Sequence, residues 1–323
     1  MPLVNSSYKA PLLLRNGHLS TIYSAKLRRV GELTQQRERL WLDDGDFLDL
    51  DWSWSGPETD KLIVLLHGLE GNANRHYIIG SAHYFTNNGF DAVGVNFRGC
   101  SGEPNKLYRS YHSGVTDDLE SVIKHIIKQD KYKTIVIKGI SLGGNVLLKY
   151  LGENKNIPKA IKAGIAISVP CSLSGSCVEL HKFNNKLYHD NFKYFLVKKL
   201  KQKREQFPDL VTYDEIRAIR TLKDFDDVYT SRAHGFRDAD DYYESCSSLN
   251  VLDQISVPTL LLNAKNDSFL SDDCYPVDLA NMHKHIFLEM PERGGHVGFN
   301  QLNGVQYNES RAHNFVSEKV FQS

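Results

Sequence analysis

A serine flanked by glycines is the residue of this sequence best placed for chemistry. Ser141 stands in the segment Gly-Ile-Ser-Leu-Gly at 139–143, after the β-branched run 134–137 and before the helix-forming run 146–150. Such a strand-to-helix corner pushes a serine hydroxyl out of a sheet, and glycine two positions before and after avoids a collision. The following helix directs unpaired N–H groups at the site, which favours negative charge there. The pattern predicts a nucleophile elbow rather than an ordinary glycine-serine turn.

A histidine and a carboxylate must activate such a serine, because a serine hydroxyl is a weak nucleophile at neutral pH. Functional groups of parallel sheets lie just beyond the carboxyl ends of the strands, which excludes most of the 13 histidines. His296 follows the last predicted strand on a glycine-flanked loop, and Asp267 follows the strand before it. The order Ser141, Asp267, His296 is the order that elbow-type hydrolases use. Asp272 or Asp273 is the alternative acid.

Two N–H groups must bind the oxyanion that forms when a serine attacks a carbonyl group. We expect one from Leu142, which follows the nucleophile, and one from Leu69, in the loop behind the third predicted strand. Each such donor typically lowers the barrier by about 3 kcal/mol. Because both donors belong to the main chain, substitutions at Leu69 or Leu142 would test shape rather than charge. His67, in the same loop, is predicted to contact the substrate.

Other reactive residues fit the pattern less well. Cys100 follows the fourth predicted strand without an elbow around it, which favours a small buried residue in a turn. His112 and Asp117 have the H-x4-D spacing of some acyltransferases, but Asp117 is better placed at the start of a helix. His234 and Phe236 belong to an inserted segment, where they could reach over the substrate or pack within that segment. The sequence has no glycine-rich phosphate loop or metal-ligand spacing, so we expect no cofactor and no metal.

The elements that must position these residues alternate along the chain. Apolar runs predict eight strands, of which the first two, 38–42 and 47–54, form an antiparallel hairpin. The other six strands are expected at 62–66, 91–97, 134–140, 163–169, 259–263 and 285–290, and the clearest helices at 78–88, 115–128 and from about 310. Alternating strands and helices predict an α/β fold with an eight-stranded, mostly parallel, doubly wound sheet.

A long interruption separates the sixth and seventh predicted strands. Residues 170–248 are too many for a plain connection, so we expect a helical cap between core segments 1–169 and 249–323. Within it, residues 181–204 carry eight Lys or Arg and one Asp. Their apolar positions near helical spacing are Phe183, Leu187, Phe195 and Leu200. Basic amphipathic helices of this kind can lie on anionic membrane surfaces. We favour the interpretation that it is a lid helix whose apolar side covers the active site.

The composition is that of an ordinary globular protein of 323 residues, with 41% hydrophobic and 24% charged residues. Lys and Arg number 39, as do Asp and Glu, so no long-range attraction to nucleic acid is expected. Five cysteines without a C-x-x-C pair favour a reducing compartment. The start of the chain lacks a signal-peptide pattern, and no apolar run approaches the roughly 18 residues of a membrane span. We expect a soluble cytoplasmic protein of undetermined oligomeric state.

Several motifs resemble those of a known group of proteins, the α/β-hydrolase fold and, within it, the YheT-like bacterial hydrolases with their phospholipase-like plant and animal relatives. The matching segments extend along most of the chain, at 16–22, 67–71, 96–105, 111–114, 139–145 and 294–299, and the run 98–105 is the most specific. The resemblance implies a triad of Ser141, Asp267 and His296 and the hydrolysis of carboxylic esters. The animal relatives resemble membrane-anchored enzymes that act on glycerophospholipids or acylglycerols, and this sequence shows no such anchor.

The residues and the resemblance together predict a serine carboxylesterase whose substrate is a small acyl ester of short-to-medium chain length. A lipase, phospholipase or acyltransferase acting on lipid acyl esters is the alternative, followed by a thioesterase. A catalytically silent scaffold is disfavoured, because degenerate scaffolds normally lose a member of the triad and all three residues are present here.

Overall fold

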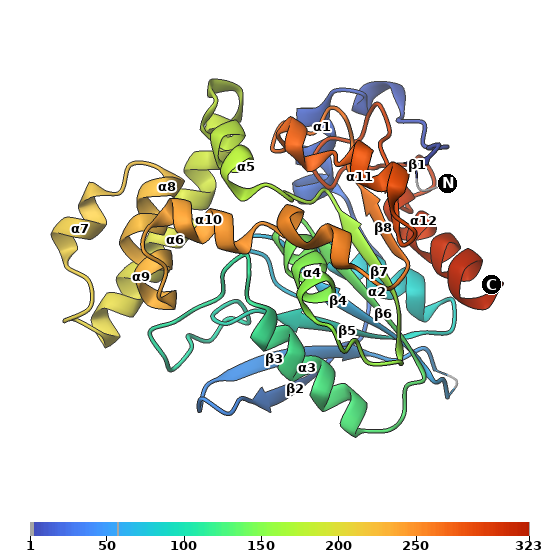
Figure 1. Ribbon diagram of the computed structural model, residues 1–323, viewed down its shortest axis with the longest axis horizontal. Helices are drawn as coiled ribbons and strands as arrows, with labels where there is room; N and C mark the ends of the chain where they lie inside the picture. Colours follow the sequence, from blue (N-terminus) through green and yellow to red (C-terminus); the bar gives the residue numbers. More distant parts are fainter. Residues whose placement is uncertain (1–2, 57, 323) are drawn as a thin grey trace.

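A twisted β-sheet with helices on both faces forms the centre of the computed structural model, which describes residues 3–56 and 58–322 (Figure 1). Within these residues the sheet has nine strands in the order β1-β9-β8-β7-β6-β4-β5-β3-β2. Their bounds are β1 Leu3–Val4, β2 Gln36–Trp41, β3 Phe47–Ser53, β4 Lys61–Leu66, β5 Asp91–Asn96, β6 Thr134–Ile140, β7 Ile161–Ile167, β8 Thr259–Leu262 and β9 Ile286–Glu289. The fold is α/β, as predicted.

The sheet is mostly parallel. Strand β3 is antiparallel to both its neighbours, β2 and β5, and the other described strand pairs are parallel. The predicted hairpin is therefore confirmed as β2 and β3. The expected count of eight strands omits β1, which pairs Leu3 and Val4 with β9 and so forms one edge of the sheet. Two residues are too few to show an alternating pattern, so this strand had no signal in the sequence.

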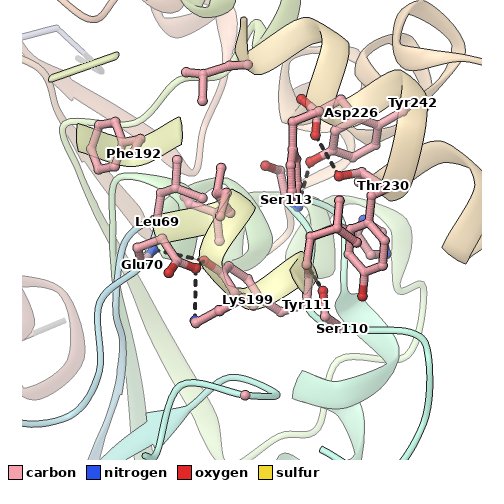
Figure 2. A pocket seen from close by; sticks show the side chains of 18 of the residues that line it. Leu69, Glu70, Ser110, Tyr111, Ser113, Phe192, Lys199, Asp226, Thr230 and Tyr242 are labelled. Carbon is pink, nitrogen blue, oxygen red and sulfur yellow. Dashed lines mark hydrogen bonds and ion pairs between the residues drawn. The ribbon is translucent and has the colours of Figure 1, made fainter. Parts of the chain in front are cut away.

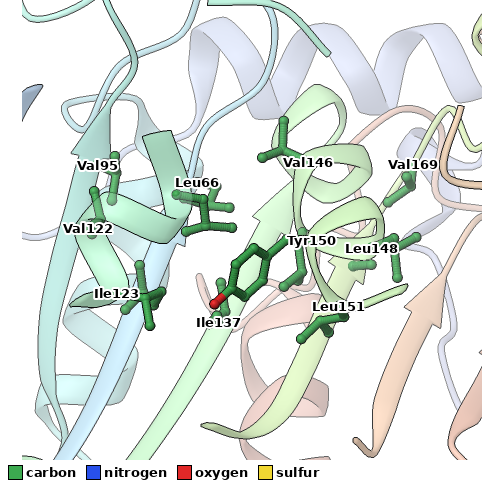
Figure 3. Close-up of a cluster of buried hydrophobic side chains, with 14 of the residues drawn as sticks. Leu66, Val95, Val122, Ile123, Ile137, Val146, Leu148, Tyr150, Leu151 and Val169 are labelled. Atoms are coloured by element: carbon green, nitrogen blue, oxygen red, sulfur yellow. The ribbon is translucent and has the colours of Figure 1, made fainter. Parts of the chain in front are cut away.

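Helices cover the two faces of the sheet because successive strand residues point to opposite sides. In β4, Leu62, Val64 and Leu66 contact one core cluster, and Ile63 and Leu65 contact the other. The first cluster includes residues of α3 (Thr116–Lys128) and α4 (Leu142–Glu153), as Figure 3 shows. The second includes residues of α2 (His76–Thr86) and α12 (Tyr307–Val316). Both faces are thus buried, as a parallel sheet requires.

The terminal helix α12 begins at Tyr307, earlier than the expected start near Ser310. Its first turn is fixed by a capping box, in which the side chains of Gln306 and Glu309 each bond to the other residue's main chain. Such reciprocal bonds satisfy N–H groups that would otherwise lack a partner at a helix start. Because the box uses Gln rather than Ser or Thr as its first residue, the sequence signal for it is weak.

The segment between β7 and β8 is helical and lies beside the sheet, coloured lime to orange in Figure 1. Its helices are α5 Leu173–His181, α6 Lys186–Gln206, α7 Tyr213–Ala218, α8 Leu222–Phe225, α9 Ser231–His234 and α10 Ala239–Cys246. The segment has two small apolar clusters of its own. A smaller core separate from the two sheet clusters is consistent with an insertion that folds over the site.

The apolar side of the basic helix differs from the expected one. Of its four predicted members, Leu200 is 1% exposed, whereas Phe183 is 91% and Leu187 is 69% exposed. Phe183 lies in a 3-10 turn before α6, because the chain is extended at Lys182. The side that faces the interior instead includes Phe192, Leu196 and Leu200, which line a cavity together with Ser141.

In the part of the chain that the structure describes, no helix combines the length and apolar character needed to cross a bilayer. All five cysteines are free and buried.

Candidate active site

Ser141 occupies a sharp corner between β6 and α4, with the unusual backbone angles φ 55° and ψ −121°. A non-glycine residue with positive φ persists only where the surrounding structure enforces it. A methyl group on Gly139 would lie 2.2 Å from the carbonyl oxygen of Gly143, and one on Gly143 would lie 2.6 Å from that of His67. The predicted collision across the corner is confirmed for Gly139, whereas Gly143 is required because the main chain of Leu66 and His67 lies against it. The strand-to-helix corner is present as expected.

The structure brings Ser141, His296 and Asp267 together in one hydrogen-bonded chain. His296 Nδ1 lies 2.8 Å from Asp267 Oδ2, and His296 Nε2 lies 2.9 Å from Ser141 Oγ. A carboxylate can only accept, so in a neutral imidazole Nδ1 carries the proton and Nε2 accepts the hydrogen bond from the serine hydroxyl. Asp267 and His296 are buried. Asp272 and Asp273, the alternative acids, are exposed on a turn.

Neighbouring groups hold the acid and the imidazole in place. The main-chain N–H of Phe269 donates to Asp267 Oδ1 at 3.0 Å, so this carboxylate is bonded through both oxygens. The ring of Phe269 stacks on the imidazole of His296 with centroids 4.2 Å apart and an interplanar angle of 26°. Rotation of either side chain would break these contacts, so the site is preorganised.

The histidine loop is anchored by residues to which the sequence analysis assigned no role. The main-chain N–H groups of residues 295–297 donate, in order, to Asn266 Oδ1, Thr21 Oγ1 and Ser168 Oγ at 2.8–2.9 Å. Thr21 Oγ1 in turn donates to the Gly17 carbonyl, within α1 (Gly17–Ile22). The motif at 16–22 therefore acts through the loop that carries His296. The resemblance of this motif to related sequences was the one feature that could have indicated its importance. Its contact with the histidine loop could not be predicted, because the two segments are far apart in the sequence.

The two predicted oxyanion donors lie beside the serine. Leu69 and Leu142 line the same cavity as Ser141. Leu142 is the first residue of α4, so its N–H has no carbonyl partner within the helix. The loop that carries Leu69 passes close to the nucleophile, since a methyl group on Gly68 would lie 3.1 Å from Ser141 Cβ. Both residues therefore lie near the hydroxyl, and their role as oxyanion donors stays a prediction.

His67 has a structural position instead of the expected contact with substrate. The described lining of the cavity does not include it, and its side chain is fully buried. Its Nε2 accepts a hydrogen bond from the Phe97 N–H at 3.2 Å, and its Nδ1 donates to the Gly68 carbonyl at 2.8 Å. Burial lowers the pKa of this imidazole to about 3. The neutral ring therefore fixes the loop before Leu69.

His234 and Phe236 pack between the inserted segment and residues 110–112 of the core, whereas the sequence suggested substrate contact or packing within the insertion. The ring nitrogens of His234 lie 2.8 Å and 3.0 Å from the carbonyl oxygens of Thr230 and Ser110. Phe236 lies against Tyr242, with ring centroids 5.4 Å apart. Neither His234 nor Phe236 is part of the described cavity lining. The expectation that they bind substrate is therefore replaced by a packing role.

The remaining candidates occupy ordinary structural positions. Cys100 is buried in a turn, as favoured, and burial raises the pKa of its thiol to about 11. Asp117 lies in the first turn of α3, as expected, where it accepts a hydrogen bond from Arg109 at 2.8 Å. His112 Nδ1 accepts from the Gly114 N–H at 3.2 Å. His112 and Asp117 are thus engaged by other groups.

A cavity of about 180 Å³ lies over the serine, between the sheet and the inserted helices. Ser141, His296 and Leu69 line it on the sheet side, and Phe192 and Leu200 on the side of the insertion. Most of the lining is apolar. Figure 2 shows two polar regions, with Glu70 and Lys199 on one side and Asp226 with Thr230 and Tyr242 on another. An apolar pocket with a few polar groups is typical of small-molecule sites.

Comparisons with known proteins identify the family of this chain. Residues 57–274 match the profile of the family described as serine aminopeptidase, S33. The chain is 33% identical over 289 residues to YheT of Escherichia coli, a protein named as an esterase, with 88% of this chain and 84% of that one covered. The chain belongs to the YheT-like family of α/β-hydrolases. This YheT-like hydrolase is also 30% identical over 292 residues to phospholipase ABHD3 of Bos taurus, covering 87% of this chain and 69% of that one.

Solved structures of low sequence identity share the fold of this hydrolase. An esterase of Pyrococcus furiosus has a TM-score of 0.60 and 20% identity, with 90% of this chain and 96% of that one covered. An esterase of Butyrivibrio proteoclasticus, Est1E, has a TM-score of 0.58 and 18% identity, with 88% and 99% covered. At these identities the similarity shows the α/β-hydrolase architecture, and the chemistry has to be argued from the site.

Proposed function

We propose that this YheT-like hydrolase is a serine carboxylesterase that cleaves esters of short-to-medium acyl chains. The observation that carries the proposal is the hydrogen-bonded chain from Asp267 through His296 to Ser141, with distances of 2.8 Å and 2.9 Å. Ser141 and His296 line an apolar cavity, and Asp267 is buried behind the imidazole. An acyl chain in that cavity would present its carbonyl carbon to the serine.

Each step of the reaction uses a group already in position. His296 Nε2 takes the proton of Ser141 Oγ as that oxygen attacks the carbonyl carbon, and Asp267 stabilises the imidazolium that forms. The N–H groups of Leu69 and Leu142 bind the oxyanion. The imidazolium then protonates the departing alcohol, which leaves the acyl group on Ser141. Water, deprotonated by His296, releases the acid by the same route.

We further propose that residues 170–248 act as a cap over this site, within a cytoplasmic enzyme. Phe192, Leu196 and Leu200 of α6 line the cavity opposite the serine. Burying an acyl chain against them stabilises the complex by about 0.8 kcal/mol per methylene group. Five free, buried cysteines are consistent with a reducing compartment.

An activity on lipid acyl esters, by a lipase, phospholipase or acyltransferase, is the second candidate, and an exposed patch on the cap favours it. Phe183 and Leu187 are largely exposed and follow Lys182 and Lys186 in the sequence, which form surface ion pairs with Glu179 and Asp190. Apolar residues beside lysines are typical of contact with an anionic lipid surface. Relatives named as a phospholipase and, in Saccharomyces cerevisiae, as a monoacylglycerol lipase also support this candidate.

A series of p-nitrophenyl esters from two to sixteen carbons, with and without anionic vesicles, separates the two candidates. We expect kcat/KM to peak at short-to-medium chains without vesicles, because the cavity over the serine has a volume of only about 180 Å³. A preference for long chains that depends on vesicles would favour the lipid activity instead. Absence of hydrolysis at every length, by folded protein, would refute the esterase proposal.

The support of the histidine loop gives a more specific prediction. Thr21→Val keeps the shape of the side chain but removes the hydroxyl that accepts from the His296 N–H. Since small misplacements of a catalytic group can cost up to about a hundredfold in rate, we expect kcat to fall by roughly tenfold with KM nearly unchanged. Thr21→Ser should recover most of the rate.

The matched control for Thr21→Val is Thr86→Val in α2, where a buried threonine hydroxyl donates to the His83 carbonyl. Both variants exchange a hydroxyl for a methyl group in a buried helix position. If both variants lose activity and stability to the same extent, the loss in Thr21→Val reflects the removal of any buried hydroxyl. The proposed anchoring of the histidine loop by Thr21 would then be wrong.

A further inference from the structure

The far side of the cavity contains a carboxylate that the proposed reaction does not use. Asp226 follows α8 and lines the cavity. Thr230 Oγ1 donates to its Oδ1 at 2.6 Å, and Tyr243 OH donates to its Oδ2 at 2.7 Å. Among the described residues, no basic side chain forms an ion pair with Asp226. Lys223, three residues earlier, pairs with Asp240 instead.

The other charged groups of the cavity lining have partners. Lys199 Nζ lies 2.9 Å from Glu70 Oε1, and Arg98 pairs with Asp118 at 2.7 Å. Lys203 is buried and donates to main-chain carbonyl oxygens. Within the described lining, Asp226 is therefore the carboxylate that lacks a counter-ion. Figure 2 shows Asp226 and Thr230 apart from the Glu70–Lys199 pair.

The surroundings of this carboxylate are aromatic. Phe225, Tyr229, Tyr242 and Tyr243 line the cavity together with Asp226. An unpaired charge among such side chains is costly, and burial raises the pKa of Asp226 to about 6. Aromatic faces attract cations, most strongly where water is excluded. A positively charged ligand group would supply the missing counter-ion and make use of the rings.

We propose that the cap side of the cavity binds an organic ammonium group of the substrate, with Asp226 as its counter-ion and Tyr229, Tyr242 and Tyr243 as its walls. The proposal rests on the esterase function for its chemistry and names the kind of substrate that the site prefers. The ammonium group can belong to the acyl chain or to the alcohol, because both parts of an ester extend from the serine into the cavity.

Two pairs of esters test this proposal at pH 8, where the carboxylate is ionised. On the acyl side, p-nitrophenyl 6-(trimethylammonio)hexanoate is compared with p-nitrophenyl 7,7-dimethyloctanoate, which has carbon in place of the charged nitrogen. On the alcohol side, choline hexanoate is compared with 3,3-dimethylbutyl hexanoate. The members of each pair have the same shape, so a difference in kcat/KM reports the charge. The pair that shows the difference identifies the part of the ester that carries the ammonium group.

We expect the wild-type enzyme to prefer the cationic member of one pair by about tenfold, the size of one desolvated cation–aromatic contact with its counter-ion. Asp226→Asn should abolish this preference, so that the two members of each pair have about the same kcat/KM. Asp226→Glu should retain part of it. Asp214→Asn, which removes an exposed cap carboxylate paired with Arg217, is the matched control and should keep the full preference.

Equal rates for both members of both pairs, with wild-type enzyme, would overturn the proposal even if Asp226→Asn fails to fold. A preference that persists in folded Asp226→Asn would overturn it as well. If the esterase proposal itself is wrong, the result is different, because the wild-type enzyme then hydrolyses neither the cationic nor the neutral esters.

Discussion

The Ser141→Ala variant is expected to lose ester hydrolysis by about a millionfold in kcat, as nucleophile removal does in other serine hydrolases. Without Oγ no acyl-enzyme can form, and the residual rate would come from the oxyanion donors and from binding alone. The measurement is kcat for the best p-nitrophenyl ester of the series. The fold should be unaffected, because serine and alanine have similar size and the same strain at φ 55°.

The control for this variant is Ser121→Ala, which removes another serine hydroxyl, on α3, where it donates to the Asp117 carbonyl. That variant should hydrolyse esters at the wild-type rate. The variant must first be purified free of esterases of the expression host. If Ser141→Ala then retains more than a few per cent of the wild-type activity, another residue is the nucleophile.

The second large effect is expected for Asp267→Asn, with a loss of about ten-thousandfold in kcat. An asparagine amide can donate to His296 Nδ1, which would leave the proton on Nε2. The imidazole would then be unable to accept the proton of Ser141 Oγ, although the shape of the site is preserved. The residue accepts from two groups, His296 Nδ1 and the Phe269 N–H, so the free energy of unfolding should be measured as well.

Asp272→Asn is the matched control for Asp267→Asn, because Asp272 is the alternative acid in the same loop region and is exposed. It should leave kcat unchanged. A larger loss for Asp272→Asn than for Asp267→Asn would show that the loop rearranges to bring the other acid to the histidine.

The central part of the fold could be predicted because its signals are local. A buried parallel strand such as β6 reads as a continuous apolar run, and the corner after it needs glycine at two fixed positions. The topology then places the ends of β6, β8 and β9 at one edge of the sheet. For this reason Ser141, Asp267 and His296 could be chosen from the sequence, and the structure brings them within hydrogen-bonding distance.

The roles of the other histidines could not be predicted, because they depend on contacts between distant segments. His67 bonds to the main chain of Phe97, thirty residues away. His234 lies against the Ser110 carbonyl, across 124 residues. A histidine next to a predicted site has no local feature that tells a ligand contact from a bond to a main-chain group.

The cap was the least predictable part. The break at Lys182 has neither proline nor glycine, so the sequence favoured one continuous helix and placed Phe183 on its apolar side. Short helices such as α7, α8 and α9 bury only one or two residues each, which leaves little periodicity. Asp226 showed no signal at all, since its importance arises from the cavity that several of these helices form together.

Labelling by a fluorophosphonate probe tests most directly whether His296 and Asp267 activate Ser141. The probe reacts with an activated serine hydroxyl, and peptide mass spectrometry locates the adduct. We expect one adduct, on Ser141, at a rate that falls sharply in Asp267→Asn and to background in Ser141→Ala. Folded wild-type protein that remains unlabelled, or labelled at another residue, would contradict the proposed mechanism.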